Sequence, residues 1–263
     1  MTQFATLSTG PTIAYDDVGQ GLPLVLGHGF LLDSSIFSGQ AGSLSDRYRV
    51  ITWHARGHGA TEYDGRPFSL WDNARDLIAL LDALGIDRAV IGGHSMGGFV
   101  ALSAALLAPR RIAGLVLINT TPYGQEQYSA GKQQAFADAW QTTGPTRELC
   151  QLFGQGMFGG GRLEPWTEKW MKQTPAQCAH PFRAVAERDD LSPRLPEITA
   201  PALVVHGSGD AGISVAQTRQ WASALPHASP PVVIDGAPHA SCATHPEEVT
   251  AAIDRFLSAL PSA

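Results

Sequence analysis

With 263 residues, 44% of them hydrophobic and 16% charged, the chain is long enough to bury a core in one domain that carries an insertion. Its formal net charge of -6 argues against nucleic acid or an anionic membrane surface as a partner. The three cysteines are widely spaced and form no metal-binding pattern, which predicts reduced thiols. The N-terminus has no signal-peptide pattern, and no apolar run is long enough for a membrane span. We therefore expect a cytoplasmic protein without a membrane span.

Short apolar runs bounded by Gly, Pro or Asp predict strands along most of the chain. The later runs are nearly continuous in Val, Ile and Leu, which is typical of strands buried on both faces of a parallel sheet. The predicted strands span residues 12–18, 23–29, 48–53, 89–93, 114–119, 202–207 and 231–235.

Segments with helical periodicity lie between these strands, at residues 69–85, 95–109, 216–225 and 246–260. In the first of them Ser69 is a candidate N-cap and Gly85 a C-terminal stop, whereas the second is small and apolar on all sides. Because strands and helices alternate, the sequence predicts an α/β fold with a mostly parallel central sheet flanked by helices.

The alternation stops between residues 121 and 198, where no strand pattern occurs and aromatic residues mix with polar ones. We expect several helices with loops here, including a flexible turn at residues 154–161 with the sequence GQGMFGGG. The predicted division is a core domain of residues 1–120 and 199–263 and a helical cap of residues 121–198. The cap would cover the carboxyl edge of the sheet, where open α/β sheets bind ligands; an ordinary helical insertion is the alternative.

The sequence GHSMG at residues 93–97 matches the pattern G-x-S-x-G between a predicted strand and a predicted helix. This context is typical of a nucleophile elbow, in which the serine hydroxyl projects from the edge of the sheet. The positions two before and two after the serine must be small, since larger side chains would collide where strand and helix cross. Ser95 is therefore the candidate nucleophile, and a phosphate-binding loop is disfavoured because no lysine follows the glycines.

A serine nucleophile needs a base and an orienting acid, which follow it in the chain order Ser, acid, His. His239 lies between the last predicted strand and the last predicted helix and is the candidate base, with His245 as its rival. Asp210 follows the strand at residues 202–207 and is the candidate acid, with Asp235 as the alternative.

Two backbone N–H groups are candidates for binding the oxyanion of a tetrahedral intermediate. Met96 directly follows the candidate nucleophile at the start of a helix, where the helix dipole also favours an anion. Phe30 lies in the loop after the strand at residues 23–29. His28, two residues earlier, is expected to be a buried, hydrogen-bonded residue that shapes this loop.

Five short motifs occur in the order found in the α/β-hydrolase superfamily: HGF at 28–30, ARGHGATE at 55–62, GHSMGG at 93–98, HGSGD at 206–210 and APHA at 237–240. The chain resembles this superfamily over essentially its whole length. It looks closest to cap-bearing bacterial carboxylesterases, enol-lactonases and cofactor-free haloperoxidases or perhydrolases. The resemblance implies the same triad of Ser95, Asp210 and His239 and the same donors, Phe30 and Met96.

Two departures from the family pattern bear on function. His54 stands where relatives usually carry a structural aspartate, so we expect a local change there, with a place at the rim of the pocket as the alternative. Ser95 argues against haloalkane dehalogenases and epoxide hydrolases, which use an aspartate nucleophile. The loop after His28 lacks the Gly-Pro-Gly that is typical of carbon–carbon bond hydrolases, which makes that activity a weaker alternative.

The sequence thus predicts a serine hydrolase that cleaves a small, mostly apolar carboxylic ester or lactone through an acyl-enzyme, with no metal and no organic cofactor. The alternatives are peracid formation when peroxide intercepts the acyl-enzyme, carbon–carbon bond hydrolysis, and a non-catalytic binding protein on the same fold. The candidate substrate-binding residues are Leu31, Trp140, Phe153, Met157 and Phe158.

Overall fold

The computed structural model describes residues 1–260 apart from residues 63, 125–129 and 161–162. Its strands are β1 (Gln3–Thr6), β2 (Thr12–Val18), β3 (Pro23–Gly27), β4 (Arg49–Trp53), β5 (Ala89–His94), β6 (Ile112–Ile118), β7 (Ala202–Gly207) and β8 (Val232–Ile234). Its α-helices are α1 (Ser38–Leu44), α2 (Leu70–Ala83), α3 (Met96–Leu107), α4 (Ala130–Thr143), α5 (Arg147–Phe158), α6 (Glu164–Trp170), α7 (Pro175–Ala186), α8 (Val215–Ala222), α9 (Ser241–Thr244) and α10 (Pro246–Ala259). Short 3-10 helices occupy Ser34–Phe37 (η1), Pro109–Arg111 (η2) and Ser192–Glu197 (η4).

The strands form one eight-stranded sheet in the order β1-β2-β4-β3-β5-β6-β7-β8. Only the pairs β1–β2 and β2–β4 are antiparallel, and all other pairs are parallel. This confirms the predicted α/β fold with a mostly parallel sheet. All seven predicted strands are present, but β1 escaped prediction because its four residues are almost entirely exposed and carry no buried apolar pattern.

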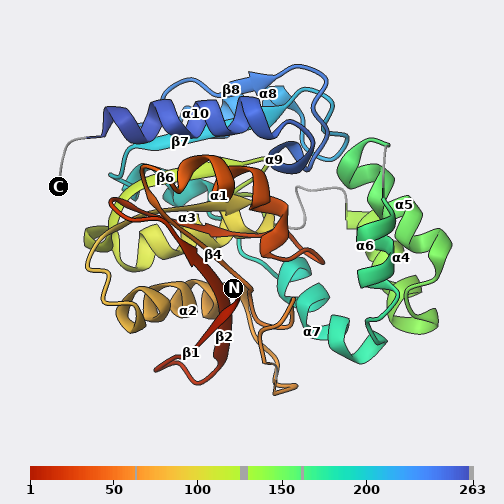
Figure 1. Ribbon diagram of the computed structural model, residues 1–263. Helices are drawn as coiled ribbons and strands as arrows, with labels where there is room; N and C mark the ends of the chain where they lie inside the picture. Colours follow the sequence, from red (N-terminus) through yellow and green to blue (C-terminus); the bar gives the residue numbers. More distant parts are fainter. Residues whose placement is uncertain (63, 125–129, 161–162, 261–263) are drawn as a thin grey trace.

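Helices cover both faces of the sheet and enclose two separate cores (Figure 1). Successive side chains of a strand point to opposite faces, so Val25 of β3 belongs to the core that includes residues of α2, α3 and α8, whereas its neighbours Leu24 and Leu26 belong to the core that includes residues of α1 and α10. This arrangement buries the central strands completely and leaves their carboxyl ends as the place where loops gather.

Helix α2 begins where the sequence indicates. The Ser69 side chain accepts a hydrogen bond from the N–H of Asp72, and the Asp72 carboxylate accepts one from the N–H of Ser69, so the two residues form a capping box. Gly85 follows the helix with φ +63°, a conformation that favours glycine. Both predicted ends of the helix are therefore confirmed.

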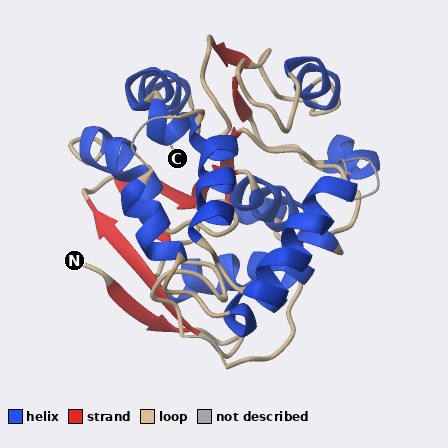
Figure 2. Cartoon of the chain, turned by 90° about the vertical axis from the view of Figure 1, so that its right-hand side faces the viewer, coloured by secondary structure: helices blue, strands red, loops and turns tan. Residues whose placement is uncertain are grey.

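Helices α4 to α7 follow β6 and lie together at one side of the sheet, and Figure 2 shows helices in front of the strands from that side. We propose that they form the cap, within the predicted range of residues 121–198. The predicted turn at residues 154–161 is wrong in its first half, because α5 continues to Phe158 and ends at Gly159 in the left-handed conformation. Gly154 lies within this helix, and the side chains of Leu163 and Trp170 lie within contact distance of the position that a Cβ atom would take there.

Among the helices of the described ranges, none combines the length and the apolar character that crossing a membrane requires.

Candidate active site

Ser95 occupies the single-residue connection between β5, which ends at His94, and α3, which begins at Met96. Its φ of +51° is sparsely populated for residues other than glycine, so the turn is strained. Hydrogen bonds fix the backbone on both sides, because the Ser95 N–H donates to the carbonyl of Ile118 at 2.9 Å and its carbonyl accepts from the Thr120 hydroxyl at 2.7 Å. Strand β6 thereby holds the serine in its strained conformation.

The glycines that flank Ser95 are required by close contact between chain segments. A Cβ atom at Gly93 would collide with the carbonyl oxygen of Gly27, and one at Gly97 would collide with the carbonyl oxygens of Gly27 and His28. The end of β3 thus crosses directly beneath the turn, which is the steric reason that the sequence pattern implied.

His239 and Asp210 form a hydrogen-bonded pair beside this turn. The His239 Nδ1 atom lies 2.7 Å from Asp210 Oδ2, and because a carboxylate only accepts hydrogen bonds, Nδ1 carries the proton. In the neutral ring Nε2 then carries a lone pair that can accept a proton, as a general base requires. Asp210 follows β7 and His239 follows β8, so both come from the carboxyl edge of the sheet.

The Asp210 carboxylate is surrounded by hydrogen-bond donors. Its Oδ2 atom also accepts from Asn119 Nδ2 at 2.9 Å, and Oδ1 accepts from the N–H groups of Gly212 and Ile213 at 2.8 and 3.0 Å. Burial alone would raise the pKa of this carboxyl group, but the charge of His239 and these hydrogen bonds outweigh burial and hold the pKa well below its usual range. Asp210 is therefore ionised at neutral pH.

The rivals of these two residues lie in structural positions. His245 precedes α10 as its N-cap residue, and its Nδ1 atom contacts the hydroxyl of Thr244 at 2.9 Å. Asp235 follows β8 and accepts a hydrogen bond from the Ser208 hydroxyl at 3.0 Å. The geometry brings Asp210 and His239 together and gives the rivals other partners.

His94 supports the loop that carries His239. It is fully buried, and its Nε2 atom donates to the backbone carbonyl of His239 at 3.0 Å. Burial, with a smaller contribution from the charge of His239, lowers the pKa of His94 to about 3, so its ring stays neutral. Sequence analysis missed this role, since position 94 is the variable residue of the G-x-S-x-G pattern.

A cavity of about 450 Å³ opens at the candidate nucleophile. The core and the loop that directly follows β6 contribute Phe30, Leu70, Ser95, Met96, Phe99, Thr120, Thr121, Asp210, Ala211, Gly212, Ile213 and His239. The segment between β6 and β7 contributes Phe136, Leu152, Phe153, Gly156, Met157, Phe182, Val185, Ala186 and Arg188. The structure therefore brings together the proposed triad and both proposed oxyanion donors at one mostly apolar cavity of ligand size.

The two candidate oxyanion donors lie on opposite sides of Ser95 in the chain order and meet at this cavity. Met96 is the first residue of α3, where backbone N–H groups have no partner within the helix and the helix dipole favours negative charge. Phe30 is held in a tight turn, in which the Leu32 N–H donates to the carbonyl of Gly29 at 3.1 Å.

Of the five candidate substrate-binding residues, Phe153 and Met157 line the cavity, and the other three lie outside its lining. Leu31 is buried and its backbone carbonyl accepts a hydrogen bond from Trp170. Trp140 packs against the lining rings of Phe153 and Phe182, with ring centres 6.4 and 6.3 Å apart. Phe158 stacks on Trp166. These are packing positions that composition alone does not separate from lining positions.

His54, the departure from the family pattern, is a buried structural residue and does not line the cavity. Its Nδ1 atom accepts a hydrogen bond from the Ala60 N–H at 2.8 Å, and its Nε2 atom lies 2.7 Å from the Ser34 hydroxyl. An imidazole nitrogen thus accepts a backbone N–H within the turn, so the change is local, as expected.

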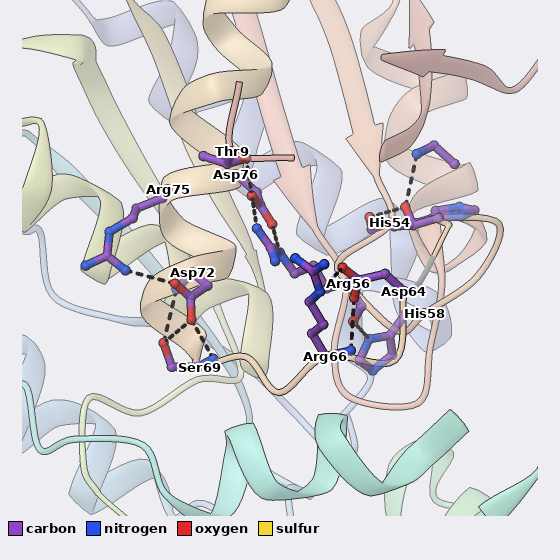
Figure 3. Close-up of polar contacts among 12 residues, drawn as sticks. Thr9, His54, Arg56, His58, Asp64, Arg66, Ser69, Asp72, Arg75 and Asp76 are labelled. Carbon is purple, nitrogen blue, oxygen red and sulfur yellow. Dashed lines mark hydrogen bonds and ion pairs between the residues drawn. The ribbon is translucent and has the colours of Figure 1, made fainter. Parts of the chain in front are cut away.

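The rest of this turn is anchored to α2 (Figure 3). The Arg56 guanidinium binds the fully buried Asp76 carboxylate through two hydrogen bonds of 2.5 and 2.8 Å, and the Thr9 hydroxyl adds a third at 2.6 Å. These contacts give the RGHG segment at residues 56–59 a structural role. His28 accepts the Ala55 N–H at 3.1 Å and donates to the Gly29 carbonyl at 2.7 Å, so it joins this turn to the loop that carries Phe30.

Asn119 is a site residue that sequence analysis did not identify. It follows β6 with φ +44°, is fully buried, and bridges the Ser241 hydroxyl, 2.5 Å away, to Asp210. A polar residue directly after an apolar strand of a parallel sheet was the available signal, because the carboxyl ends of such strands meet at the site.

Comparison with known proteins gives the family. A model described as "Alpha/beta hydrolase family" matches residues 24–252. The chain belongs to this family. It is 28% identical over 271 residues to a non-heme haloperoxidase of Rhodococcus erythropolis, covering 97% of this chain and 98% of the relative.

Solved structures of the family share the fold closely. A thermophilic esterase from Thermogutta terrifontis has a TM-score of 0.89 at 28% identity, with both chains covered in full. The enol-lactonase from Burkholderia xenovorans LB400 has a TM-score of 0.85 at 25% identity, covering 97% of this chain and 100% of the other. The family thus includes esterase, lactonase and haloperoxidase relatives of this chain.

Proposed function

We propose that this chain is a serine hydrolase that cleaves a small, mostly apolar carboxylic ester or lactone through an acyl-enzyme intermediate. The observation that carries the proposal is the His239–Asp210 pair, protonated at Nδ1, at the same cavity as Ser95 in its strained turn. A buried carboxylate, an imidazole and a serine in this arrangement are the parts of a nucleophilic triad.

In the proposed reaction His239 Nε2 takes the Ser95 hydroxyl proton as Oγ attacks the substrate carbonyl. The oxyanion that forms accepts hydrogen bonds from the N–H groups of Phe30 and Met96. His239 then gives the proton to the departing alkoxide, and the acyl group stays on Ser95. Water then attacks the acyl-enzyme as His239 takes one of its protons. His239 passes that proton to Ser95 Oγ as the bond to the acyl group breaks, and the carboxylic acid leaves. Asp210 keeps the imidazole in its productive tautomer throughout.

The lining of the cavity supports a mostly apolar substrate. Aromatic rings of Phe30, Phe136, Phe153 and Phe182 surround the volume together with Met157, and the volume of about 450 Å³ fits a compound of modest size. The hydroxyl of Thr120, one of the few polar groups there, is already bound to the Ser95 carbonyl. Apolar contact therefore provides most of the proposed binding energy.

A second candidate activity is peracid formation, which the haloperoxidase relative favours. In this reaction hydrogen peroxide attacks the acyl-enzyme in place of water, and the released peracid oxidises a halide ion. Leu31 follows Phe30 in this chain, where peracid-forming relatives often have proline. Halogenation of an indicator dye that depends on both peroxide and a carboxylic acid measures this activity beside ester hydrolysis.

The three thiols support a proposal for the compartment of this protein. Cys150, Cys178 and Cys242 are buried and free, and burial raises the pKa of Cys242 to about 12, so this thiol is unreactive. We propose a reducing compartment, the cytoplasm, for this protein.

The first test is the mass of the intact protein after reaction with a fluorophosphonate, with Ser95→Ala compared with the wild type. Ser103→Ala is the matched control, because Ser103 lies on α3 and its hydroxyl is buried and bonded to the Phe99 carbonyl. We expect one adduct on the wild type and on Ser103→Ala and none on Ser95→Ala. Without the probe, only the wild type and Ser103→Ala should turn over short nitrophenyl esters or simple lactones. An unlabelled, folded wild type that binds esters without turnover would support a binding protein instead.

A further inference from the structure

Helix α6, between the two cap helices α5 and α7, contacts the loop that carries Phe30 at two points. The Trp170 indole Nε1 donates a hydrogen bond of 2.6 Å to the backbone carbonyl of Leu31. One residue earlier in α6, the Lys169 ammonium group binds Asp33 Oδ2 at 2.7 Å and the Ser35 hydroxyl at 3.0 Å. Both contacts join residues separated by more than 130 positions in the chain, so folding of the distant segment determines the shape of this loop.

The loop is strained at the residue that Trp170 binds. The hydrogen bond from the Leu32 N–H to the Gly29 carbonyl closes a four-residue turn with Phe30 and Leu31 at its centre. Leu31 has φ +58°, which is rare for a bulky residue and persists only when surrounding contacts hold it. The Leu31 carbonyl and the Leu32 N–H belong to one planar peptide group, and the Gly29 carbonyl that the Leu32 N–H binds belongs to the same peptide group as the Phe30 N–H. A contact that fixes the first peptide group therefore also holds the second, which carries the proposed donor.

The Trp170 side chain is packed on several sides. Its side chain is fully buried. Its ring packs edge-on against that of Phe153, with 5.0 Å between the ring centres, and stacks on that of Trp166, with 6.1 Å between the ring centres. The Lys169 ammonium group lies 4.4 Å from the centre of the Trp166 ring, which completes the cluster. A buried carbonyl needs a donor, and the immobile indole supplies it to Leu31 at a fixed point.

We propose that Trp170 is a positioning residue, which holds the Leu31 carbonyl and thereby fixes the Phe30 N–H for the oxyanion. This inference rests on the proposed function and adds that the oxyanion site is completed by α6 rather than by the core alone. Phe153, which packs on Trp170, also lines the cavity, so the segment that bounds the substrate and the segment that orients the donor are one packed unit.

The proposal predicts a specific kinetic change. An oxyanion donor acts on the transition state and contributes little to binding of the ground state, so a misplaced donor lowers kcat and leaves KM nearly unchanged. Complete loss of such a donor lowers kcat by about 10²- to 10³-fold, and a donor that is retained but poorly directed costs less. For Trp170→Phe, which removes the N–H and keeps an aromatic ring, we expect a loss of about tenfold in kcat.

The experiment compares Trp170→Phe with Trp221→Phe on hydrolysis of a nitrophenyl ester and on inhibition by an alkyl trifluoromethyl ketone, which forms a tetrahedral adduct with serine. Trp221 is the matched control because it is equally buried on α8 and its indole N–H has no partner in the described part of the chain. We expect kcat and affinity for the ketone to fall by the same factor in Trp170→Phe, with KM within twofold of wild type and Trp221→Phe unchanged.

Other outcomes separate this inference from the proposed function. A wild type without ester turnover or ketone inhibition overturns both. An active wild type with equal kcat and ketone affinity in the two variants overturns the positioning role alone, as does a loss confined to KM. If Trp170→Phe does not fold, β-(3-benzothienyl)alanine at position 170 keeps the shape of the ring and removes only the N–H, and the same readouts then decide.

Discussion

At the scale of single residues, Asp210 has the most demanding surroundings in the site. Its carboxylate accepts hydrogen bonds from His239, Asn119, Gly212 and Ile213 and is buried behind the imidazole. Donors that are already in place need no rearrangement when His239 becomes positively charged, so the carboxylate is preorganised to stabilise the imidazolium.

The first prediction concerns this carboxylate. Asp210→Asn keeps the size of the side chain but removes the charge and allows the amide to donate a hydrogen to His239, which favours the wrong tautomer. We expect kcat for ester hydrolysis to fall by a factor on the order of 10⁴, as for the same change in other triads. Asp235→Asn, at the rival position, should retain wild-type kcat. Equal losses in the two variants, or a loss only in Asp235→Asn, would contradict the assignment.

The residues of the site differ in how well the sequence predicts them. Ser95, Asp210 and His239 are predictable because each stands at a strand end within a recognisable motif. Asn119 and His94 act through hydrogen bonds to these residues. The place of Asn119 directly after an apolar strand was the available signal for it, and His94 stands at the variable position of the motif. Trp170 lies still farther away in sequence, and its contact with Leu31 depends on how α6 packs. Long-range packing of this kind has no local signature.

At the scale of elements, the connection from β5 to α3 combines strain with close packing. The end of β3 lies so near that positions 93 and 97 have no room for a Cβ atom. The same closeness brings the loop that follows β3, with Phe30, to the start of α3, with Met96. The steric constraint and the proposed oxyanion site are therefore consequences of one crossing of backbone segments.

The second prediction tests this constraint. Gly97→Ala places a methyl group against the carbonyl oxygens of Gly27 and His28, so the backbone must shift and the free energy of unfolding should fall by about 2 kcal/mol or more. Gly42→Ala is the matched control, since Gly42 is an exposed helical glycine with no heavy atom within 4 Å of an added Cβ. It should stabilise the protein by about 0.5–1 kcal/mol. Urea unfolding measures both, and a Gly97→Ala variant as stable as wild type would refute the steric argument.

The predicted elements also divide along physical lines. Buried strands carry nearly continuous apolar runs, and the predicted helices are either amphipathic or, in α3, apolar on all sides. The seven strands and four helices predicted from these patterns are present. Strand β1 is exposed and helix α1 is rich in Gly and Ser, so neither has such a signal. In α5 the local propensity of residues 154–158 for a turn is overridden by packing against Trp170 and Leu163. Tertiary contacts decide structure where local preference is weak or contrary.

At the scale of the whole molecule, the distribution of buried histidines makes stability depend on pH. Burial is the main cause that lowers the pKa of each, to about 4 for His58 and about 3 for His94. The pKa values of His28, His54 and His206 are lowered for the same reason. These rings are neutral in the folded protein, whereas the unfolded chain protonates its histidines near pH 6.5.

The sign of the effect follows from proton uptake on unfolding. Between pH 6.5 and about 4 the unfolded chain binds more protons than the folded one, so the free energy of unfolding falls as the pH falls. Carboxyl groups with lowered pKa values, which include Asp210, Asp33 and Glu197, begin to lose their contribution to stability only below about pH 5.5. The thiol of Cys242, with its raised pKa, lowers stability only above about pH 8.5. The interval from pH 5.5 to 8 therefore reports mainly on the histidines, and at lower pH the difference between a histidine variant and the wild type isolates a single ring.

The third prediction is a stability that is nearly constant from pH 7 to 8 and falls steeply below pH 6.5, measured as the free energy of urea unfolding. His58→Asn should reduce the slope at pH 5 by about 1 kcal/mol per pH unit, because one proton fewer is taken up on unfolding. Asn retains a donor for the Arg56 carbonyl, which His58 Nδ1 contacts at 2.8 Å. His227→Asn, at an exposed position before β8, should leave the slope unchanged. Because the readout is a slope, it separates proton uptake from any uniform loss of stability, and equal slopes in His58→Asn and wild type would refute the role of this buried ring.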